Sequence, residues 1–141
     1  MDMATARDRL VDSLVANDII TKSSTAEAMR AVPRHKFVDA DQQAQAYQDR
    51  PLPIGNDQTI SAPHMVGHMV DLLDVEPGDR VLEIGTGCGY HAAVTSEVVG
   101  DGNVYSVEYD RELGEAARQR LADLGYDVAV RIGDGREGWP E

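Results

Sequence analysis

The sequence contains a single cysteine, Cys88, among its 141 residues. One cysteine excludes a disulfide within the chain and every metal site that is built from several cysteines. His35, His68 and His91 also lack the spacing with carboxylates that a metal site requires. We therefore expect no metal ion, and we expect Cys88 to pack against its neighbours without a chemical role.

Long apolar runs are missing as well, although 42% of the residues are hydrophobic. A membrane-spanning helix needs about 18 or more consecutive apolar residues, and no segment of that length is free of charges. The N-terminus, Met1–Ala4, also lacks the basic residues that begin a secretory signal peptide. These absences predict a cytoplasmic protein with no membrane partner.

Lysine is rare, since the sequence has 2 lysines and 11 arginines against 16 aspartates and 9 glutamates, with a net charge of -12. Binding to a nucleic-acid backbone needs clustered positive charge, so this composition argues against a nucleic-acid partner. Many aspartates with few lysines are typical of an acidic proteome in high salt, where screening removes the repulsion between like charges. An ordinary acidic cytosolic protein fits the same counts, and the composition leaves both interpretations open.

The length fits one compact domain with one hydrophobic core. In the first half, apolar spacing predicts helices over Ala4–Asn17 and Thr25–Val32. A mostly irregular stretch follows from residue 33 to residue 53, with a short helical candidate at Gln42–Tyr47. Pro63 is expected to begin a further helix, with an apolar face made of Met65, Met69, Leu72 and Leu73.

The second half changes to three short β-type runs that are separated by two helical segments. The expected strands are Arg80–Ile84, Asn103–Glu108 and Asp127–Ile132, and the expected helices are Tyr90–Val99 and Arg111–Leu124. Strands connected through helices require crossovers, which favour a parallel sheet that helices cover on both faces. The prediction is an α/β, doubly wound, Rossmann-like fold with an N-terminal helical extension.

The first predicted strand runs directly into a glycine-rich turn, Gly85-Thr86-Gly87-Cys88-Gly89, and then into a helix. Glycines lack the Cβ atom that would keep a ligand away from the backbone, and the helix N-terminus offers unpaired N–H groups. A dinucleotide site would need a glycine where this chain has Tyr90. With the acidic Glu83 two residues before Gly85, the turn instead resembles the nucleoside-methionine site of class I methyltransferases. A tight strand-to-helix turn with no ligand is the alternative interpretation.

Acidic side chains follow the next two predicted strands. Glu108 lies 23 residues beyond Gly85, where a doubly wound fold places a carboxylate that accepts hydrogen bonds from ribose hydroxyls. Asp134 stands between two glycines after the third strand, and these neighbours would let it lie near an adenine. The alternatives are a solvated strand-end charge for Glu108 and ordinary turn chemistry for Asp134.

The block Gln58–Met65, upstream of the glycine turn, resembles the protein-L-isoaspartate O-methyltransferases. Val32-Pro33-Arg34 and the turn Gly133-Asp134-Gly135 are similar to the same family, so the resemblance extends from about Met29 to Trp139. The upstream block makes the resemblance specific, because class I methyltransferases in general share only the glycine turn.

The resemblance implies methyl transfer from S-adenosylmethionine to the α-carboxylate of L-isoaspartyl residues in damaged proteins and peptides, which is a repair reaction. Ser61 would be the active-site serine that holds the substrate carboxylate, although a serine here is also typical of a helix N-cap. Gln58, Thr59 and Ile60 would line the same substrate loop. The cofactor-binding residues would be Glu83, Gly85, Thr86, Gly87, Gly89, Glu108, Asp134 and Gly135.

The resemblance also implies how the chain is organised. Residues 1–62 would form a helical and substrate-loop region, and residues 63–141 would form the first half of the cofactor domain, in one structural unit. Family members continue through several more strands and helices, so we expect the C-terminal strands to be missing and this chain to methylate poorly by itself. The complete protein would be a monomer. Two alternatives remain open: another class I methyltransferase that acts on a small molecule or RNA, and a non-catalytic cofactor-binding fragment.

Overall fold

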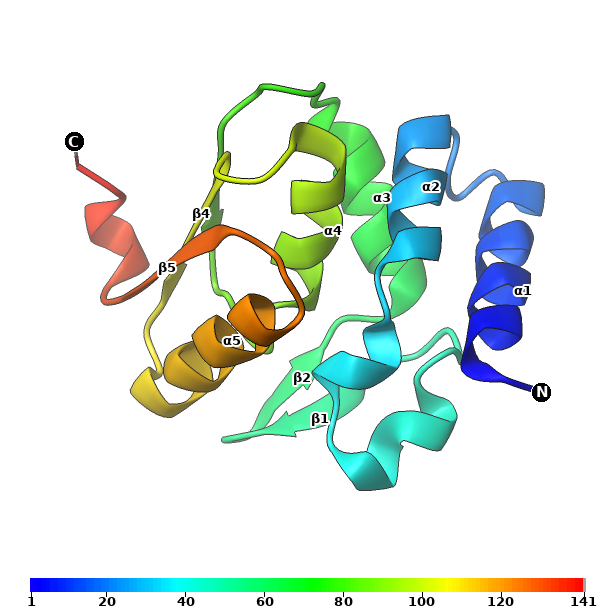
Figure 1. Cartoon of the computed structure of the whole chain (residues 1–141), viewed down its shortest axis with the longest axis horizontal. Coiled ribbons are helices and arrows are strands. Elements are labelled where there is room, and N and C mark those ends of the chain that lie inside the picture. The colour runs from blue at the N-terminus through cyan, green and yellow to red at the C-terminus, as the bar shows by residue number, and fades with distance from the viewer. Residues whose placement is uncertain (141) are drawn as a thin grey trace. The chain divides into compact units, whose positions relative to one another are not determined.

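The structure, a computed structural model, describes residues 1–140. Its contacts divide the chain into two compact units, an N-terminal unit, Met1–Val75, and a C-terminal unit, Glu76–Glu141. The N-terminal unit contains mainly helices, and the C-terminal unit contains a parallel sheet (Figure 1). The organisation expected from the sequence, with residues 1–62 and 63–141 in one structural unit, stays a prediction.

Two α-helices begin the N-terminal unit. They are α1 (Met3–Ala16) and α2 (Ser23–Ala31), and they confirm the two predicted helices to within two residues at each end. The Asp2 side chain accepts a hydrogen bond from the Thr5 N–H at 2.7 Å, which satisfies one of the free donors at the start of α1. The unit's core is apolar, and among its buried side chains are Val11, Leu14, Ile20, Met29, Val32, Phe37, Leu52, Val66 and Val70.

The stretch from residue 33 to residue 53 is less irregular than predicted. It contains two 3-10 helices, η1 (Arg34–Phe37) and η2 (Ala40–Gln45). The second lies over the helical candidate that the sequence indicated, but it starts two residues earlier and has 3-10 geometry. Short 3-10 segments of this kind are common as connectors between longer elements.

An antiparallel hairpin, which the sequence did not reveal, joins β1 (Leu52–Gly55) to β2 (Gln58–Ile60). Asn56 and Asp57 form its turn, with φ values of 52° and 59°. Asparagine and aspartate tolerate this left-handed conformation well, and two such residues in succession are typical of a type I′ hairpin turn. The strands are only 4 and 3 residues long, which is too short for a clear periodic pattern.

Helix α3 (Pro63–Leu73) begins at the predicted proline, but the prediction of its buried face is wrong. The four residues expected to form the apolar face are all at least 44% exposed: Met65, Met69, Leu72 and Leu73. The residues that face the core are Val66, Gly67 and Val70. Both sets are apolar at helical spacing, so the sequence pattern alone did not distinguish them.

Packing against the connection between α1 and α2 decides the rotation of α3. A Cβ atom at Gly67 would lie 2.9 Å from side-chain atoms of Ile20, so glycine allows the two segments to approach closely. One turn further on, the Asp71 carboxylate accepts hydrogen bonds from the Thr21 N–H at 2.6 Å and the Thr21 hydroxyl at 3.0 Å. Burial by itself raises the pKa of the Asp71 carboxyl group. The hydrogen bonds lower this pKa by more than burial raises it, so the pKa lies below its ordinary value.

The C-terminal unit is a βαβαβ arrangement, as predicted. Its elements are β3 (Val81–Ile84), α4 (Tyr90–Val99), β4 (Val104–Glu108), α5 (Arg111–Asp123), β5 (Val128–Ile132) and the 3-10 turn η3 (Gly135–Glu137). The three strands are parallel and lie in the order β3-β4-β5. Each strand begins one residue later than predicted, and α4 has the predicted bounds. The α/β, Rossmann-like fold class is therefore confirmed.

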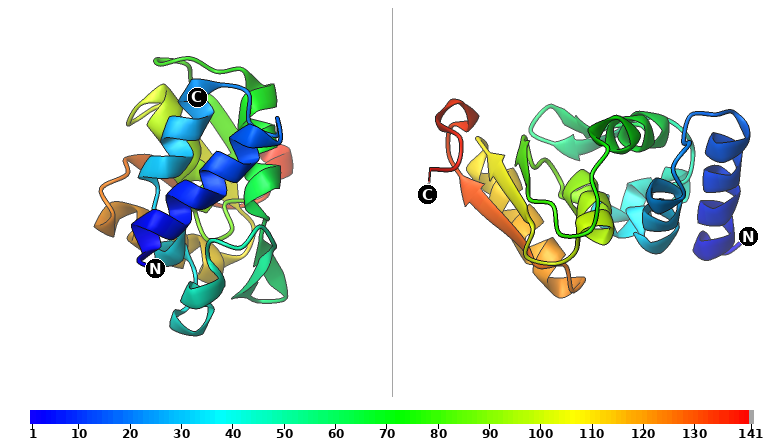
Figure 2. Two further views of the ribbon diagram at one scale, coloured as in Figure 1. Left: turned by 90° about the vertical axis from the view of Figure 1, so that its right-hand side faces the viewer. Right: turned by 90° about the horizontal axis from the view of Figure 1, so that it is seen from above.

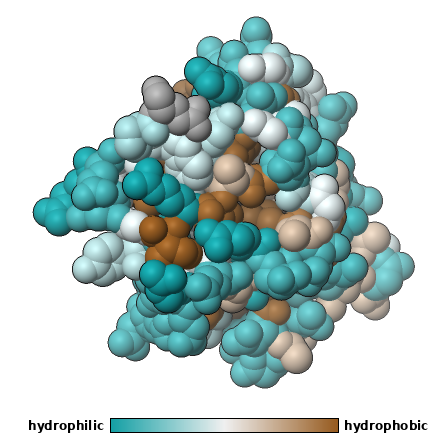
Figure 3. All heavy atoms as spheres, turned by 60° about the vertical axis from the view of Figure 1, so that its left-hand side comes forward, coloured by the Kyte–Doolittle hydropathy of each residue, from teal (hydrophilic) through white to brown (hydrophobic). Residues whose placement is uncertain are grey.

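Helices cover one face of this sheet. Within the unit, α4 and α5 lie on the same side of the strands, whereas η3 lies on the other side (Figure 2). On that other face Leu82 and Ile84 of β3 are 45% and 57% exposed, because only the short η3 turn packs there, against Ile84. Within residues 76–140 the helices α4 and α5 thus cover one face of the sheet, whereas the cover expected on the other face is limited to η3. Figure 3, which brings this side forward, shows hydrophobic atoms at the surface.

Candidate functional site

The glycine turn connects the end of β3 to the start of α4. Gly85 has a φ of 96°, and a Cβ atom there would meet no other atom within 4 Å, so a ligand can approach its backbone closely. Gly89, the N-cap of α4, has a φ of 97°, and a Cβ atom there would lie 3.2 Å from Leu121 of α5. The turn therefore combines an open approach at Gly85 with close helix packing at Gly89.

Glu108 ends β4 and is 3% exposed. Its Oε1 accepts a hydrogen bond from the Gly87 N–H at 2.8 Å, and its Oε2 accepts one from the Asp110 N–H at 2.8 Å. Hydrogen bonds to a charged acceptor are strong and fix the orientation of the carboxylate. Each oxygen carries a further lone pair, so Glu108 can hold the glycine turn and still accept hydrogen bonds from ligand hydroxyls.

A second carboxylate, Glu83, lies on β3 beside the same turn. The Ser106 hydroxyl donates a hydrogen bond to Glu83 Oε1 at 2.5 Å, and it also lies 2.6 Å from Thr86 Oγ1. Burial is the main reason that the pKa of Glu83 rises to about 7; the hydrogen bond from Ser106 opposes the rise and the charge of Glu108 adds to it. Glu83, Thr86 and Glu108 therefore form one polar cluster around the glycine turn.

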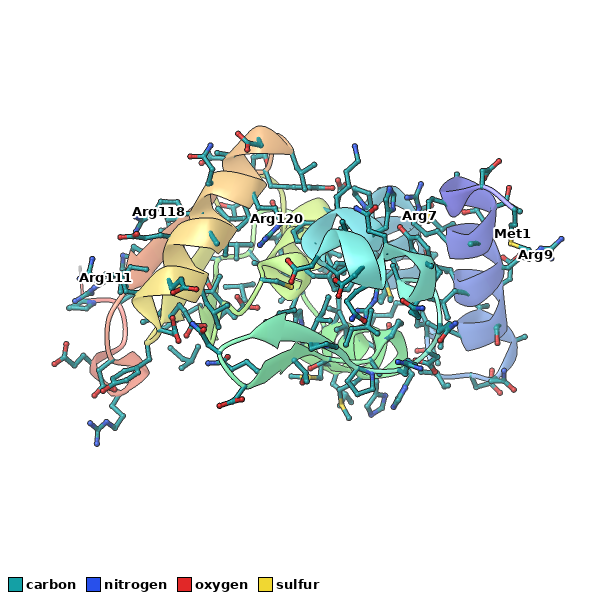
Figure 4. The ribbon with its side chains drawn as sticks, turned by 90° about the horizontal axis from the view of Figure 1, so that it is seen from below. Met1, Arg7, Arg9, Arg111, Arg118 and Arg120 are labelled. Atoms are coloured by element: carbon teal, nitrogen blue, oxygen red, sulfur yellow. The ribbon has the colours of Figure 1, made fainter. Side chains whose placement is uncertain are left out.

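Arginines of α5 hold that helix against the turn and the sheet. Arg120 Nη1 donates to the Cys88 carbonyl at 2.9 Å, and Arg118 Nη2 donates to the Val130 carbonyl at 2.7 Å. Figure 4 shows both arginines, with Arg111, along α5. The Cys88 side chain is buried, which agrees with the packing role expected for it.

Asp134 and Gly135 follow β5. Hydrogen bonds from the Arg136 guanidinium, with one oxygen 2.6 Å from Nη2, and from the Arg136 N–H at 2.9 Å lower the pKa of Asp134. The neighbouring Gly133 N–H donates to the Glu108 carbonyl at 2.9 Å, so this segment lies beside the end of β4. A Cβ atom at Gly135 would overlap the Ile84 side chain, and glycine is needed there for η3 to pack against β3.

Ser61 follows the hairpin in the N-terminal unit, and its side chain is exposed. The interpretation of Ser61 as the N-cap of α3 is wrong, because the N-cap is Ala62 and no side chain of the cap residue bonds to the helix. Asp49 acts in its place by accepting a hydrogen bond from the His64 N–H at 2.8 Å. The Ser61 hydroxyl is therefore not used in starting the helix.

A buried arginine, Arg34, fixes the backbone at Ser61 through a hydrogen bond. Its side chain is 0% exposed, and its guanidinium donates to three carbonyl oxygens: Ala46 at 2.8 Å, Ser61 at 2.9 Å and Arg50 at 3.2 Å. A buried charge is tolerated when hydrogen bonds satisfy it, and these bonds tie together the chain before and after the hairpin. Gln58 and Thr59 are exposed on β2, whereas Ile60 is buried.

The structure thus groups the predicted residues into two sets. The predicted cofactor residues lie in the C-terminal unit, around the carboxyl ends of its three strands, and the predicted substrate-loop residues lie on and after β2. Sequence reasoning missed Ser106 and the three hydrogen bonds that Arg34 donates to backbone carbonyl groups. A polar residue in the apolar strand of residues 104–108 was the available signal for Ser106, and no local signal showed that Arg34 would be buried.

Residues 1–140 contain no group of three or more His, Cys, Asp or Glu side chains that could hold a metal ion. In the same residues, no helix is both long enough and apolar enough to cross a membrane.

Comparison with known proteins places the chain in a family. Residues 5–141 match the model of the family described as protein-L-isoaspartate(D-aspartate) O-methyltransferase. This chain belongs to that family. Among curated members, it is 54% identical over 141 residues to protein-L-isoaspartate O-methyltransferase 2 of Archaeoglobus fulgidus, and 51% identical over 140 residues to the Ignicoccus hospitalis protein. The matched segments are 99% and 98% of this chain, but only 64% and 66% of those relatives, so the chain spans less than two thirds of their length.

A solved structure of the family supports the fold. A chain titled protein-L-isoaspartate O-methyltransferase superposes with a TM-score of 0.86 at 34% identity, and the match covers 95% of this chain and 44% of that one. The family resemblance seen in the sequence is therefore confirmed, and it covers both units of the structure.

Proposed function

We propose that this chain is the cofactor-binding and substrate-loop part of a protein repair methyltransferase. The reaction would transfer a methyl group from S-adenosylmethionine to the α-carboxylate of L-isoaspartyl residues in damaged proteins and peptides. The observation that carries the proposal is the family match over residues 5–141, which includes both the glycine turn and the Gln58–Met65 block. A class I methyltransferase for small molecules or RNA would have no reason to carry that block.

The residues around the glycine turn fit this cofactor. S-adenosylmethionine carries a positive sulfonium and an ammonium group, and the turn lies between the carboxylates of Glu83 and Glu108. The open side of Gly85 lets the ligand approach the backbone, and the first turn of α4 presents N–H groups to polar ligand atoms. The proposed cofactor residues are Glu83, Gly85, Thr86, Gly87, Gly89, Glu108, Asp134 and Gly135.

Glu108 is proposed to bind the ribose. Its two oxygens are already oriented by the N–H groups of Gly87 and Asp110, so little side-chain entropy would be lost when ribose hydroxyls bind. Asp134 is proposed to lie near the adenine, because its segment is attached to the end of β4 through Gly133. Its hydrogen bonds from Arg136 lower its pKa and keep it ionised.

Ser61 is proposed to hold the substrate carboxylate. A carboxyl group with an ordinary pKa of about 4 is already ionised at neutral pH, so methyl transfer to it needs no general base. Catalysis then depends on alignment of the attacking oxygen with the methyl group, and orientation can lower a barrier by roughly 7 to 11 kcal/mol. The exposed Ser61 side chain, on a segment that Arg34 holds in place, can supply one positioning hydrogen bond. Gln58, Thr59 and Ile60 belong to the same proposed loop.

Calorimetry and a methylation assay test the proposal. We expect the chain to bind S-adenosylhomocysteine, and we expect a protein of family length that carries this sequence to methylate an isoaspartyl peptide but not the same peptide with normal aspartate. Binding followed by methylation of RNA or a small molecule instead would favour a different class I methyltransferase. Binding with no methylation of any substrate by the longer protein would favour a non-catalytic role, and no binding at all would contradict the proposal.

The surroundings of the protein are also part of the proposal. A cytoplasmic location, a monomeric state of the complete protein and the absence of a nucleic-acid partner stay predictions. The net charge of -12 supports the last of these, because phosphate backbones repel an acidic surface. Sedimentation of the family-length protein would test its predicted monomeric state. Its retention on immobilised RNA would contradict the predicted absence of a nucleic-acid partner.

A further inference from the structure

A row of polar groups lies inside the otherwise apolar layer between the sheet and its helices. Ser106 is 0% exposed, and along β4 it alternates with Tyr105 and Val107, so it shares the helix-covered face with Glu108. The strand register places Ser106 directly beside Glu83 of β3. A buried hydroxyl needs hydrogen-bond partners, and Ser106 finds both of its partners toward the glycine turn.

The number of available hydrogens decides the direction of these bonds. A serine hydroxyl donates only one hydrogen, and it accepts through its lone pairs. Ser106 donates that hydrogen to Glu83 Oε1 at 2.5 Å, so at its 2.6 Å contact with Thr86 Oγ1 it must accept. Thr86 is then the donor, and the bonds run from Thr86 through Ser106 to the carboxylate of Glu83.

We propose that Ser106 is a positioning residue of the cofactor site, whose hydroxyl links the protonation state of Glu83 to the side chain of Thr86 and thereby to the conformation of the glycine turn. The inference rests on the proposed function, because it takes the turn as part of the S-adenosylmethionine site. Ser106 itself is too buried to touch the cofactor. It acts through Thr86, which is also buried and stands between Gly85 and Gly87.

Protonation of Glu83 at Oε1, the oxygen that Ser106 contacts, reverses the direction of the bonds. A protonated carboxyl group donates to Ser106, Ser106 then donates to Thr86, and the hydrogen of the Thr86 hydroxyl loses its acceptor. This reversal falls near neutral pH, because burial raises the pKa of Glu83 to about 7. Glu108, on the neighbouring strand, is the charged group that acts on Glu83, and it adds to the rise. Ionised Glu83 also attracts the ammonium group of the cofactor, so the ionised form is the one that favours binding.

The test measures the affinity for S-adenosylhomocysteine by calorimetry across the neutral pH range. In the parent, affinity should increase with pH through the titration of Glu83. Ser106→Ala removes a donor that stabilises the carboxylate, so the midpoint should move upward by about 0.4 to 1 pH unit, the equivalent of one hydrogen bond. At pH 7 the variant should bind about 2- to 6-fold more weakly, because a smaller fraction of Glu83 is then ionised. Ser106→Thr, which keeps the hydroxyl, should restore the parent midpoint.

Matched variants separate this effect from a loss of packing. Ser96→Ala makes the same change at another buried serine of this unit, on α4, where the hydroxyl contacts Asp101 at 3.4 Å. It should leave the pH midpoint where it is. Ser106→Cys keeps the size of the side chain with a weaker donor, and it replaces Ser106→Ala if the latter does not fold. Glu83→Gln should remove the increase of affinity with pH, because this variant has no carboxyl group at that position to titrate. The double variant Glu83→Gln with Ser106→Ala should also show no such increase.

Nuclear magnetic resonance of ¹³C-labelled glutamate carboxyl groups gives a second measurement, on the protein without ligand. Glu83 should titrate at a higher pH in Ser106→Ala, or in Ser106→Cys, than in the parent. If the parent binds the ligand and these variants keep both its pH midpoint and its Glu83 titration, the inference is overturned and the proposed function stands. If the parent does not bind the ligand at all, the proposed function fails, and the role of Ser106 in that site fails with it.

Discussion

Replacement of Glu108 by glutamine tests the anchor of the glycine turn. Glu108→Gln keeps the size of the side chain but removes the charge and one of the two acceptor oxygens. In the structure those oxygens accept hydrogen bonds from the Gly87 and Asp110 N–H groups, both at 2.8 Å. A glutamine can accept only one of them, and its NH₂ group then faces the other N–H. A buried donor without a partner costs about 1 to 3 kcal/mol, so the free energy of unfolding should fall by about that amount.

The same change should weaken cofactor binding. Hydrogen bonds from ribose hydroxyls to a carboxylate are charge-assisted, and the loss of one costs about 1.5 to 3 kcal/mol. The Kd for S-adenosylhomocysteine should therefore rise roughly 10- to 150-fold. Urea unfolding followed by circular dichroism measures the stability, and calorimetry at a temperature where the variant is folded measures the Kd.

Glu97→Gln is the matched control, because Glu97 is exposed on α4. An exposed substitution of this kind should change the free energy of unfolding by less than about 0.5 kcal/mol. If Glu108→Gln behaves like this control in both measurements, the role assigned to Glu108 is refuted. If stability falls but the Kd does not change, Glu108 anchors the turn and its assignment to the ribose is wrong.

Three further substitutions test other parts of the site. Folding raises the pKa of Glu83 from 4.5 to about 7, so the folded state binds this proton more tightly than the unfolded state does. The parent therefore loses stability as the pH rises between those values. Glu83→Gln lacks this titration, so relative to the parent its free energy of unfolding should increase by on the order of 3 kcal/mol between about pH 5 and about pH 8. Arg34→Met leaves three carbonyl groups without their donor and should destabilise the protein by about 3 kcal/mol or more in urea unfolding, whereas Arg9→Met, at an exposed position of α1 (Figure 4), should not. In a protein of family length, Ser61→Ala should slow methylation of an isoaspartyl peptide roughly 10- to 1000-fold with an unchanged cofactor Kd, and a parent rate would remove Ser61 from the mechanism.

Local sequence information determined the C-terminal unit. Its strands are short apolar runs, and its helices are bounded by residues that end or begin helices for local steric reasons. Helix α4, for example, lies between Gly89 and Gly100, whose φ values of 97° and 98° suit glycine, and its predicted bounds agree with the structure. The glycine turn was visible for the same reason. The Gln58–Met65 block, which is also local, indicated the family that the comparisons then established.

Only tertiary structure decided which side chains are buried and where polar groups find partners. Helix α3 has two apolar faces of similar composition, and the buried one is chosen by the fit of Gly67 against Ile20 and by the hydrogen bonds of Asp71 to Thr21. From the sequence, Arg34 would be expected at the surface. It is buried because three backbone carbonyl groups from other parts of the chain accept its hydrogen bonds.

The polar groups under the glycine turn show the same limit. The local sequence shows Ser106 only as a polar residue in an apolar strand, and only the parallel register places it beside Glu83. Glu108 likewise accepts a hydrogen bond from the Gly87 N–H only because β4 lies next to β3. Side-chain periodicity and turn chemistry act over a few residues and are therefore encoded locally. Burial and hydrogen-bond partners depend on residues that are far apart in the sequence, such as Thr86 and Ser106, which are 20 positions apart. These contacts form only when folding brings the residues together.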